Sequence, residues 1–310
     1  MCLGLYALSN LDYALILCAN RDEYLERPTL AAAFHSFEPL AQDVHSPPAP
    51  SSEGLVLSGR DCAAGGTWLG VSRSGRIAVL TNITEEHGSY STSRGELASS
   101  FLTSNLPLSE YVTKLTAQEN WKSYAGFNML LLSPSSAVPL QFDGRFVSNG
   151  GAGGAITARA LRPDEFNYGG ISNGAEASGG DEWPKVVEGR TNLARAVEGY
   201  RDRTDVPNDK ILIDSLFDVL SSHSESEIRS RGDLRNTVRV EPLHVPYPTK
   251  DRSSTVPRSY GTRLATFLLV RRTGEVTFVE RDVWKTTPSG STVFGSPDDD
   301  RVHRFSISLP

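Results

Sequence analysis

The sequence has few cysteines and histidines, and their spacing argues against two common kinds of site. Its three cysteines, Cys2, Cys18 and Cys62, form neither an even disulfide framework nor a metal-binding pair. The six histidines include no HExxH motif and no paired arrangement, so the sequence gives little support to a zinc site. Free thiols in this small number are typical of a reducing compartment.

Long hydrophobic runs and clusters of basic residues are also missing. The longest apolar run near the N-terminus, Tyr13–Ala19, is too short to span a bilayer, and no positive residue precedes the first apolar run as it would in a secretory signal. No cluster of Lys and Arg stands out in a chain of net charge -6, which argues against a nucleic-acid partner. These absences predict a cytoplasmic protein without a transmembrane segment, and they leave its oligomeric state open.

The 310 residues have an ordinary globular composition, with 38% hydrophobic and 22% charged residues. Strand and helix patterns come in blocks, and this order favours antiparallel sheets covered by helices, an α+β fold, over a βαβ alternation. We interpret residues 1–310 as a single domain with a flexible surface loop at about residues 38–58, which are rich in Pro, Ser and Ala. The expected helices are Arg94–Leu102, Leu108–Ala117, Trp183–Val197 and Lys210–Ser221.

The N-terminal stretch reads as a hairpin, with strands at Leu3–Leu8 and Tyr13–Ala19. Because a hairpin folds its end back beside its start, the polar run Asn20–Glu23 is expected to emerge close to Cys2. A second hairpin is expected to end on Asn82. Further strands are expected at Phe127–Leu132, Ala137–Phe142, Arg145–Val147, Arg263–Arg271, Glu275–Arg281 and His303–Leu309, with a turn at Asp143-Gly144 and loops at Gly169–Gly180 and Pro246–Pro257.

Cys2 is the sharpest candidate for chemistry. If Met1 is removed, the thiol and a free α-amine share one residue, and an amine that titrates at about pH 7.7–8 is a base for its own side chain. The alternative is that Cys2 is merely a small apolar residue at the start of a strand.

Five further residues are candidates, each with a plainer interpretation. Arg21 would lower the pKa of a nearby thiol and Asp22 would orient both cationic groups, although a four-residue polar run is commonly an exposed loop. Asn82 is a candidate oxyanion donor or a turn cap. Asn173, before a glycine, is first of all a turn residue. Arg263 opens a strand, where a charged residue commonly marks only the exposed end of the strand but could also place a cation in a cleft.

Several short motifs that follow one another along the chain carry a family resemblance. In order they are Met1-Cys2, Ala19–Glu23 with Arg27–Thr29, Gly65–Gly70, Leu80–Asn82, Arg94–Leu97, Gly126–Asn128, Ser172-Asn173, Trp183–Lys185 and Tyr260–Arg263. With this ordered set the chain resembles, nearly end to end, the NRDE-motif family, also called transport-and-Golgi-organisation protein 2.

The resemblance implies a fold like that of N-terminal-nucleophile (Ntn) hydrolases, a four-layer αββα sandwich of two antiparallel sheets flanked by helices. Within that class, the choloylglycine hydrolase and acid amidase branch cleaves linear amides with an N-terminal cysteine. Carried over, Cys2 would be nucleophile and base, and Arg21 and Asp22 the pair after the first hairpin. Asn82 and Asn173 would position the oxyanion and amine, and Arg263 would be the late arginine. That branch separates its Arg and Asp by two residues, whereas Arg21 and Asp22 are adjacent.

Two functions follow from the resemblance. The first is hydrolysis or acyl transfer on a linear amide or thioester through Cys2, with no cofactor. The second is non-catalytic binding and trafficking of a small amphipathic ligand, such as haem or an acyl-CoA lipid. It fits a family linked to Golgi organisation, secretion and mitochondrial lipid homeostasis, and to a cytoplasmic location beside mitochondria or Golgi. No histidine lies in a family motif, so no axial haem ligand is named.

Overall fold

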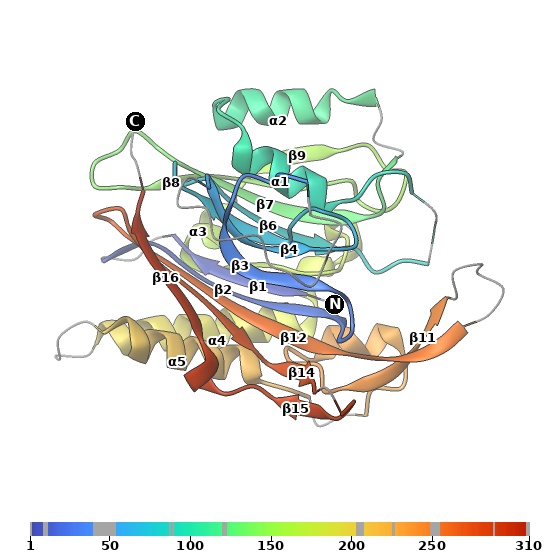
Figure 1. Ribbon diagram of the computed structural model, residues 1–310. Helices are drawn as coiled ribbons and strands as arrows, with labels where there is room; N and C mark the ends of the chain where they lie inside the picture. Colours follow the sequence, from blue (N-terminus) through green and yellow to red (C-terminus); the bar gives the residue numbers. More distant parts are fainter. Residues whose placement is uncertain are drawn as a thin grey trace.

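The computed structural model describes residues 2–8, 12–39, 54–86, 88, 90–119, 123–202, 208–224, 227–248, 255–287 and 289–307. Two seven-stranded antiparallel sheets pack face to face, and helices cover the outer face of each (Figure 1).

The first sheet has the strand order β10-β1-β2-β12-β13-β16, and β11 pairs with β12 at its edge. It therefore joins the N-terminal hairpin to the last strands of the chain. Its strands are β1 (Leu3–Ala7), β2 (Tyr13–Tyr24), β10 (Gly169–Ile171), β11 (Leu243–Pro248), β12 (Thr255–Arg271), β13 (Glu275–Asp282) and β16 (Arg301–Ser306).

The second sheet is a meander in which every strand pairs with its neighbour in the chain. Its strands are β3 (Thr29–His35), β4 (Val56–Asp61), β5 (Leu69–Ser72), β6 (Ile77–Asn82), β7 (Phe127–Pro134), β8 (Phe142–Ser148) and β9 (Thr157–Ala160). A small ribbon of β14 (Trp284–Thr286) and β15 (Thr292–Phe294) stands apart. The helices are α1 (Gly95–Thr103), α2 (Leu108–Thr116), α3 (Pro163–Tyr168), α4 (Pro184–Arg201) and α5 (Asp209–Ser221).

Side-chain alternation along the strands builds the layers. In β2, Leu15 and Leu17 enter the core between the two sheets, whereas Ile16 and Cys18 enter the core beneath α4 and α5. A third core lies between the second sheet and the pair α1 and α2. Four layers result, helices–sheet–sheet–helices, which confirms the α+β sandwich expected from the resemblance.

Most expected elements are present, but several polar stretches predicted as loops belong to strands. Strand β2 continues through Asn20–Glu23, which were expected to follow it, and β10 forms inside the predicted loop Gly169–Gly180. Backbone pairing with β12 and β1 decides both cases. A local pattern contains no information about such distant partners.

Three further corrections concern boundaries. The predicted turn Asp143-Gly144 lies within β8, and the β7–β8 connection falls at residues 135–141, where a strand was expected. Strand β11 and the start of β12 occupy part of the predicted loop Pro246–Pro257. Of the predicted loop at about residues 38–58, residues 40–53 lie outside the described part of the chain, and β4 begins at Val56.

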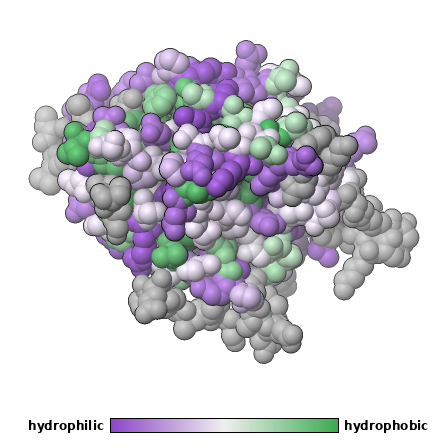
Figure 2. Space-filling model, turned by 90° about the horizontal axis from the view of Figure 1, so that it is seen from above, coloured by the Kyte–Doolittle hydropathy of each residue, from purple (hydrophilic) through white to green (hydrophobic). Residues whose placement is uncertain are grey.

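Among the described residues, no helix is long and apolar enough to cross a bilayer. On the face shown in Figure 2, hydrophilic and hydrophobic residues are interspersed, and the hydrophobic areas are small and separate.

Candidate active site

The N-terminal hairpin brings Cys2 beside the polar end of β2, as predicted. Leu3 of β1 pairs with Asn20 of β2, so the same register places Cys2 opposite Arg21. The Cys2 Sγ atom lies 3.9 Å from the backbone oxygen of Asp22. Burial raises the pKa of the Cys2 thiol and the Asp22 carboxylate raises it further, whereas the Arg21 guanidinium lowers it.

Arg21 and Asp22 lie on opposite faces of β2 because successive strand residues alternate. The Arg21 guanidinium lies 3.9 Å from the centre of the Trp68 ring, on the side that faces the second sheet. The Asp22 carboxylate instead accepts a hydrogen bond from Thr262 Oγ1 at 2.6 Å. The sequence predicts that the two residues act together beside Cys2, whereas the structure separates their side chains.

Lys185, in the first turn of α4, belongs to the candidate site although the sequence did not predict it there. Its side chain is 0% exposed, and Nζ lies 3.3 Å from Asn173 Oδ1 and 3.5 Å from the Cys2 backbone oxygen. Burial lowers the pKa of Lys185, and the negative groups Asp22 and Cys2 raise it. A buried lysine facing a candidate nucleophile has the perturbed environment typical of functional sites.

A sequence signal for Lys185 does exist. The buried residues Gly189, Leu193 and Val197 follow it at intervals of four, so Lys185 continues the core-facing stripe of α4. Gly189 lets the helix approach β1, because a Cβ there would lie 2.9 Å from Leu5 Cδ1. A charged residue on such a buried stripe indicates either a buried ion pair or a functional site.

Asn173 connects Lys185 to the second sheet. Its Nδ2 donates to the backbone oxygen of Asn82 at 2.6 Å, at the end of β6, while its Oδ1 faces Lys185. Its neighbour Ser172 donates from Oγ to the Cys2 backbone oxygen at 2.8 Å. The Asn82 residue is exposed, so the protein contact that places it in the site is made by its backbone.

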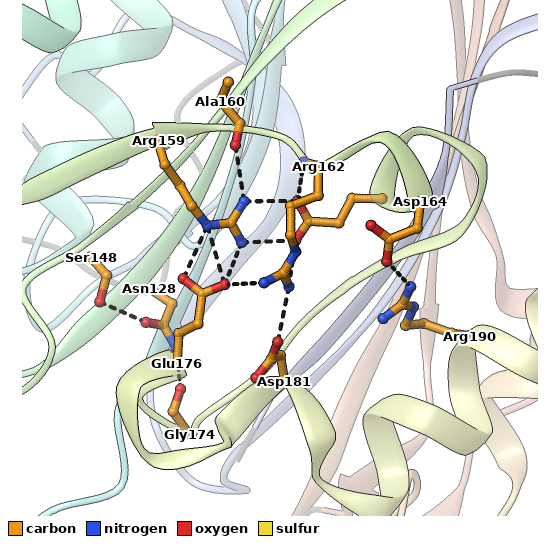
Figure 3. A network of polar contacts seen from close by, with 11 residues as sticks. Asn128, Ser148, Arg159, Ala160, Arg162, Asp164, Gly174, Glu176, Asp181 and Arg190 are labelled. Atoms are coloured by element: carbon orange, nitrogen blue, oxygen red, sulfur yellow. Dashed lines mark hydrogen bonds and ion pairs between the residues drawn. The ribbon is translucent and has the colours of Figure 1, made fainter.

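Asn128 forms hydrogen bonds to the loop that carries Asn173 (Figure 3). Asn128 Nδ2 donates to the backbone oxygens of Ser172 and Gly174, each at 2.8 Å, one on either side of Asn173. Ser148 Oγ donates to Asn128 Oδ1 at 2.8 Å and thereby fixes the orientation of the amide. Asn128 is therefore a positioning residue for the candidate site.

An ion-pair network anchors the chain just after this loop. Arg159 contacts both Glu165 and Glu176 at 2.8 and 2.6 Å, and Arg162 reaches Asp181 at 2.9 Å (Figure 3). The network ties the residues that follow Gly174 to β9 and α3.

Replacing Asn128 by alanine is expected to destabilise the chain by about 2–3 kcal/mol, because two buried hydrogen bonds to carbonyl groups are lost. Denaturant unfolding followed by circular dichroism measures this loss. The exposed Asn167 of α3 provides the control, since Asn167→Ala is expected to stay within about 0.5 kcal/mol of the native chain. Equal stabilities of the two variants would contradict the anchoring role.

Arg263 reaches the site through a β-bulge. The pairing of β12 with β2 shifts between Thr262 and Leu264, so Arg263 is the extra residue. Its Nη1 donates to the backbone oxygen of Arg27 and, at 3.2 Å, to Thr29 Oγ1, the atom that also accepts from Arg21 at 3.3 Å. Burial and the neighbouring Arg21 lower the pKa of Arg263.

The six predicted residues thus form two adjoining groups. The first gathers around Cys2 and contains Asp22, Asn173 and the backbone of Asn82, joined by Lys185. The second contains Arg21 and Arg263, joined through Thr29. Where the chain is described, no three His, Cys, Asp or Glu side chains gather in a way that could hold a metal ion.

Comparisons with known proteins agree with this architecture. The chain is 31% identical over 283 residues to a Transport and Golgi organization protein 2 homolog of Bos taurus, covering 89% of each chain. It is 31% identical over 276 residues to the Mus musculus homolog, covering 87% of each. A penicillin V acylase from Agrobacterium tumefaciens shares the fold, with a TM-score of 0.50 and 12% identity over 100% of this chain and 92% of the acylase. The family model described as Transport and Golgi organisation 2 matches residues 1–285, and the chain belongs to that family.

Proposed function

We propose that this chain is an N-terminal-cysteine hydrolase or acyltransferase that acts on a linear amide or thioester, with Cys2 as the nucleophile. The observation that carries the proposal is the group of buried polar side chains around Cys2: Ser172 and Lys185 face its backbone oxygen, and Asn173 faces Lys185. Fold likeness alone would not support it, because one fold serves many functions.

In the proposed reaction the α-amine of Cys2, freed by removal of Met1, takes the proton of the thiol. Met1 itself lies outside the described residues. The thiolate sulfur bonds to the substrate carbonyl carbon, and the carbonyl electron pair moves onto oxygen. That pair then returns, the C–N or C–S bond breaks, and the leaving amine or thiol receives the proton from the α-ammonium. Water or an acceptor amine next attacks the acyl-cysteine and frees the thiol.

The neighbouring groups have distinct roles in this proposal. A Lys185 ammonium 3.5 Å from the Cys2 oxygen disfavours a second cation on the adjacent α-amine, so it keeps that amine neutral and basic. Asn173 holds Lys185 in place. The exposed carboxamide of Asn82 is the proposed donor to the oxyanion. Asp22 offsets the charge of Lys185.

The test is trapping of the acyl-enzyme. The chain beginning at Cys2 is incubated with a p-nitrophenyl ester or an acyl thioester, and intact-mass analysis follows the added acyl group. Cys2→Ala is expected to abolish the adduct and to lower p-nitrophenol release at least about a hundredfold. Cys62→Ala is the matched control, because this half-buried cysteine has no place in the proposed reaction. Equal acylation of native and Cys2→Ala chains would refute the assignment.

The same experiment distinguishes the carrier function. A protein that carries haem or an acyl-CoA would show saturable binding without an acyl adduct, with equal affinity in the native and Cys2→Ala chains. A Soret band or a lipid in denatured extracts would identify that cargo. Hydrolysis and an adduct that both depend on Cys2 would exclude a purely non-catalytic carrier function.

A further inference from the structure

Arginines gather on the side of β2 that faces the second sheet, next to Cys2. Arg21 and Arg263 both donate to Thr29 Oγ1, Arg263 also donates to the backbone oxygen of Arg27, and the Arg27 guanidinium shares Asp61 with Arg21. The Arg21 side chain is only 6% exposed, and Arg27 is 28% exposed. Three guanidinium groups in a half-buried space repel one another unless anions balance them.

Two carboxylates face these three guanidiniums. Asp61 Oδ2 lies 2.8 Å from Arg27 and 3.8 Å from Arg21, and Glu23 lies 3.7 Å from Arg27. Within the described part of the chain, Arg263 has no carboxylate within 4.0 Å, and its hydrogen bonds go to neutral oxygens. One positive charge is therefore left without an ion pair.

Two more distant carboxylates act on Arg263, and both are engaged elsewhere. Glu280 accepts from Arg301 at 2.8 Å and from the backbone of Ala32 at 3.0 Å. Asp282 accepts two hydrogen bonds from Arg301, each at 3.0 Å. Neither can turn to Arg263 without giving up these bonds.

The cluster adjoins the candidate nucleophile. The strand register places Arg21 opposite Cys2, and Arg21 shares Thr29 Oγ1 with Arg263. A fourth arginine, Arg94, lies close enough to Cys2 to interact with its charge, and it donates to the backbone oxygen of Gly126 at 3.0 Å. A substrate whose carbonyl carbon reaches Sγ therefore comes close to these arginine side chains.

We propose that Arg263, with Arg21 and Arg27, forms a subsite for an anionic group of the substrate, a carboxylate or a phosphate, beside the thiol of Cys2. The inference rests on the proposed function only in that the anion belongs to a substrate. Anion binding at this place itself requires no turnover. Guanidinium groups suit oxygen-rich anions because their planar donor pairs match carboxylate and phosphate geometry. The bound anion supplies the negative charge that would pair with Arg263.

Two alkylating reagents of nearly equal size but different charge test the subsite. Iodoacetate is anionic and iodoacetamide neutral, and peptide mass spectrometry gives the alkylation rate of each at Cys2. The iodoacetate-to-iodoacetamide rate ratio is expected to be about tenfold higher in the folded chain than in the urea-unfolded chain, since nearby positive side chains concentrate anions. Arg263→Gln is expected to remove most of this preference, and Arg263→Lys to retain it.

The matched control is Arg195→Gln, which removes the same charge from the exposed face of α4 and is expected to leave the ratio unchanged. Phenylacetate and phenyl phosphate serve as competitors, and the one that slows alkylation of Cys2 in the native chain identifies the preferred anion. The same compound should raise the thermal unfolding midpoint of the native chain more than that of Arg263→Gln, a readout independent of the thiol.

An equal rate ratio in folded and unfolded chains would overturn the subsite, as would stabilisation by the competitors that Arg263→Gln does not reduce. Neither result depends on an acyl-enzyme. A chain that prefers iodoacetate but forms no acyl adduct would retain the subsite and lose the hydrolase proposal. A chain that forms the adduct without charge preference would do the reverse.

Discussion

Removal of Met1 is expected to raise the acylation rate at Cys2 by a factor of about 10²–10⁴, the usual contribution of a positioned general base. In the chain that retains Met1, the base for the thiol is missing. Burial then raises the pKa of that thiol above its ordinary value of 9.0. Methionine aminopeptidase treatment of purified protein, verified by intact mass, provides the two forms for comparison.

The pH profile separates the two forms further. Acylation requires the deprotonated base, so the rate rises with pH through the pKa of that base and then levels off. For the chain beginning at Cys2 we expect a midpoint at or below about pH 8, the ordinary range of an α-amine beside a cation. For the Met1 form the rate should still be rising at pH 9. Identical profiles would show that the α-amine is not the base.

Replacing Lys185 by methionine is expected to have the largest effect on stability, a loss of about 3 kcal/mol at pH 7, because it removes a buried cation that offsets the charge of the buried Asp22 carboxylate. Acylation is also expected to slow at least about tenfold, since the α-amine then stays protonated to higher pH. The exposed Lys210→Met on α5 is the matched control and should change stability by less than about 0.5 kcal/mol.

The pH dependence of this loss has a definite sign. Burial raises the pKa of Asp22 in the folded chain above its ordinary value of 3.8, and loss of the Lys185 cation raises it again. A carboxyl group with a raised pKa binds more protons when folded, so its contribution to stability is present at low pH and is lost as pH rises through the folded pKa. The Lys185→Met penalty should therefore be small near pH 4 and grow toward pH 7.

A double-mutant cycle tests the electrostatic coupling directly. Asp22→Asn in the Lys185→Met background removes the carboxylate that has lost the Lys185 cation, so the double variant should be more stable at pH 7 than the sum of the two single losses predicts, by about 1–3 kcal/mol. Additive losses would mean that the two side chains do not interact, and Lys185 would then be a packing residue.

Local patterns were sufficient for the elements with strong periodicity. The apolar runs of β1 and β2 and the amphipathic stripe of α5 lie where they were predicted. Predictions failed where a distant partner decides the conformation, as for β10, which pairs with β1 from about 165 residues away in the chain. Hydrogen bonding to a neighbouring strand stabilises this short segment, which contains two glycines and has little strand propensity of its own.

The candidate site shows the same division. Proximity of Cys2 to Asp22 follows from the hairpin, and the sequence alone leads to it. The role of Lys185 requires knowing that α4 packs against β1, and the position of Arg263 depends on a bulge that no residue pattern announces. Arg21 and Asp22, predicted as partners within the polar run Asn20–Glu23, separate because adjacent strand residues face opposite sides.

The sequence by itself determined that a thiol at the second position and the polar end of β2 would meet, because a short hairpin leaves them no other arrangement. The block order of strand and helix patterns also indicated antiparallel sheets covered by helices, whereas the four-layer order was implied by the family resemblance. Only the tertiary structure decided what surrounds the thiol. Packing of α4 brings a buried lysine to Cys2, and pairing of β12 with β2 brings a partly uncompensated arginine beside it. Both contacts join segments more than 180 residues apart, where local sequence has no influence on geometry.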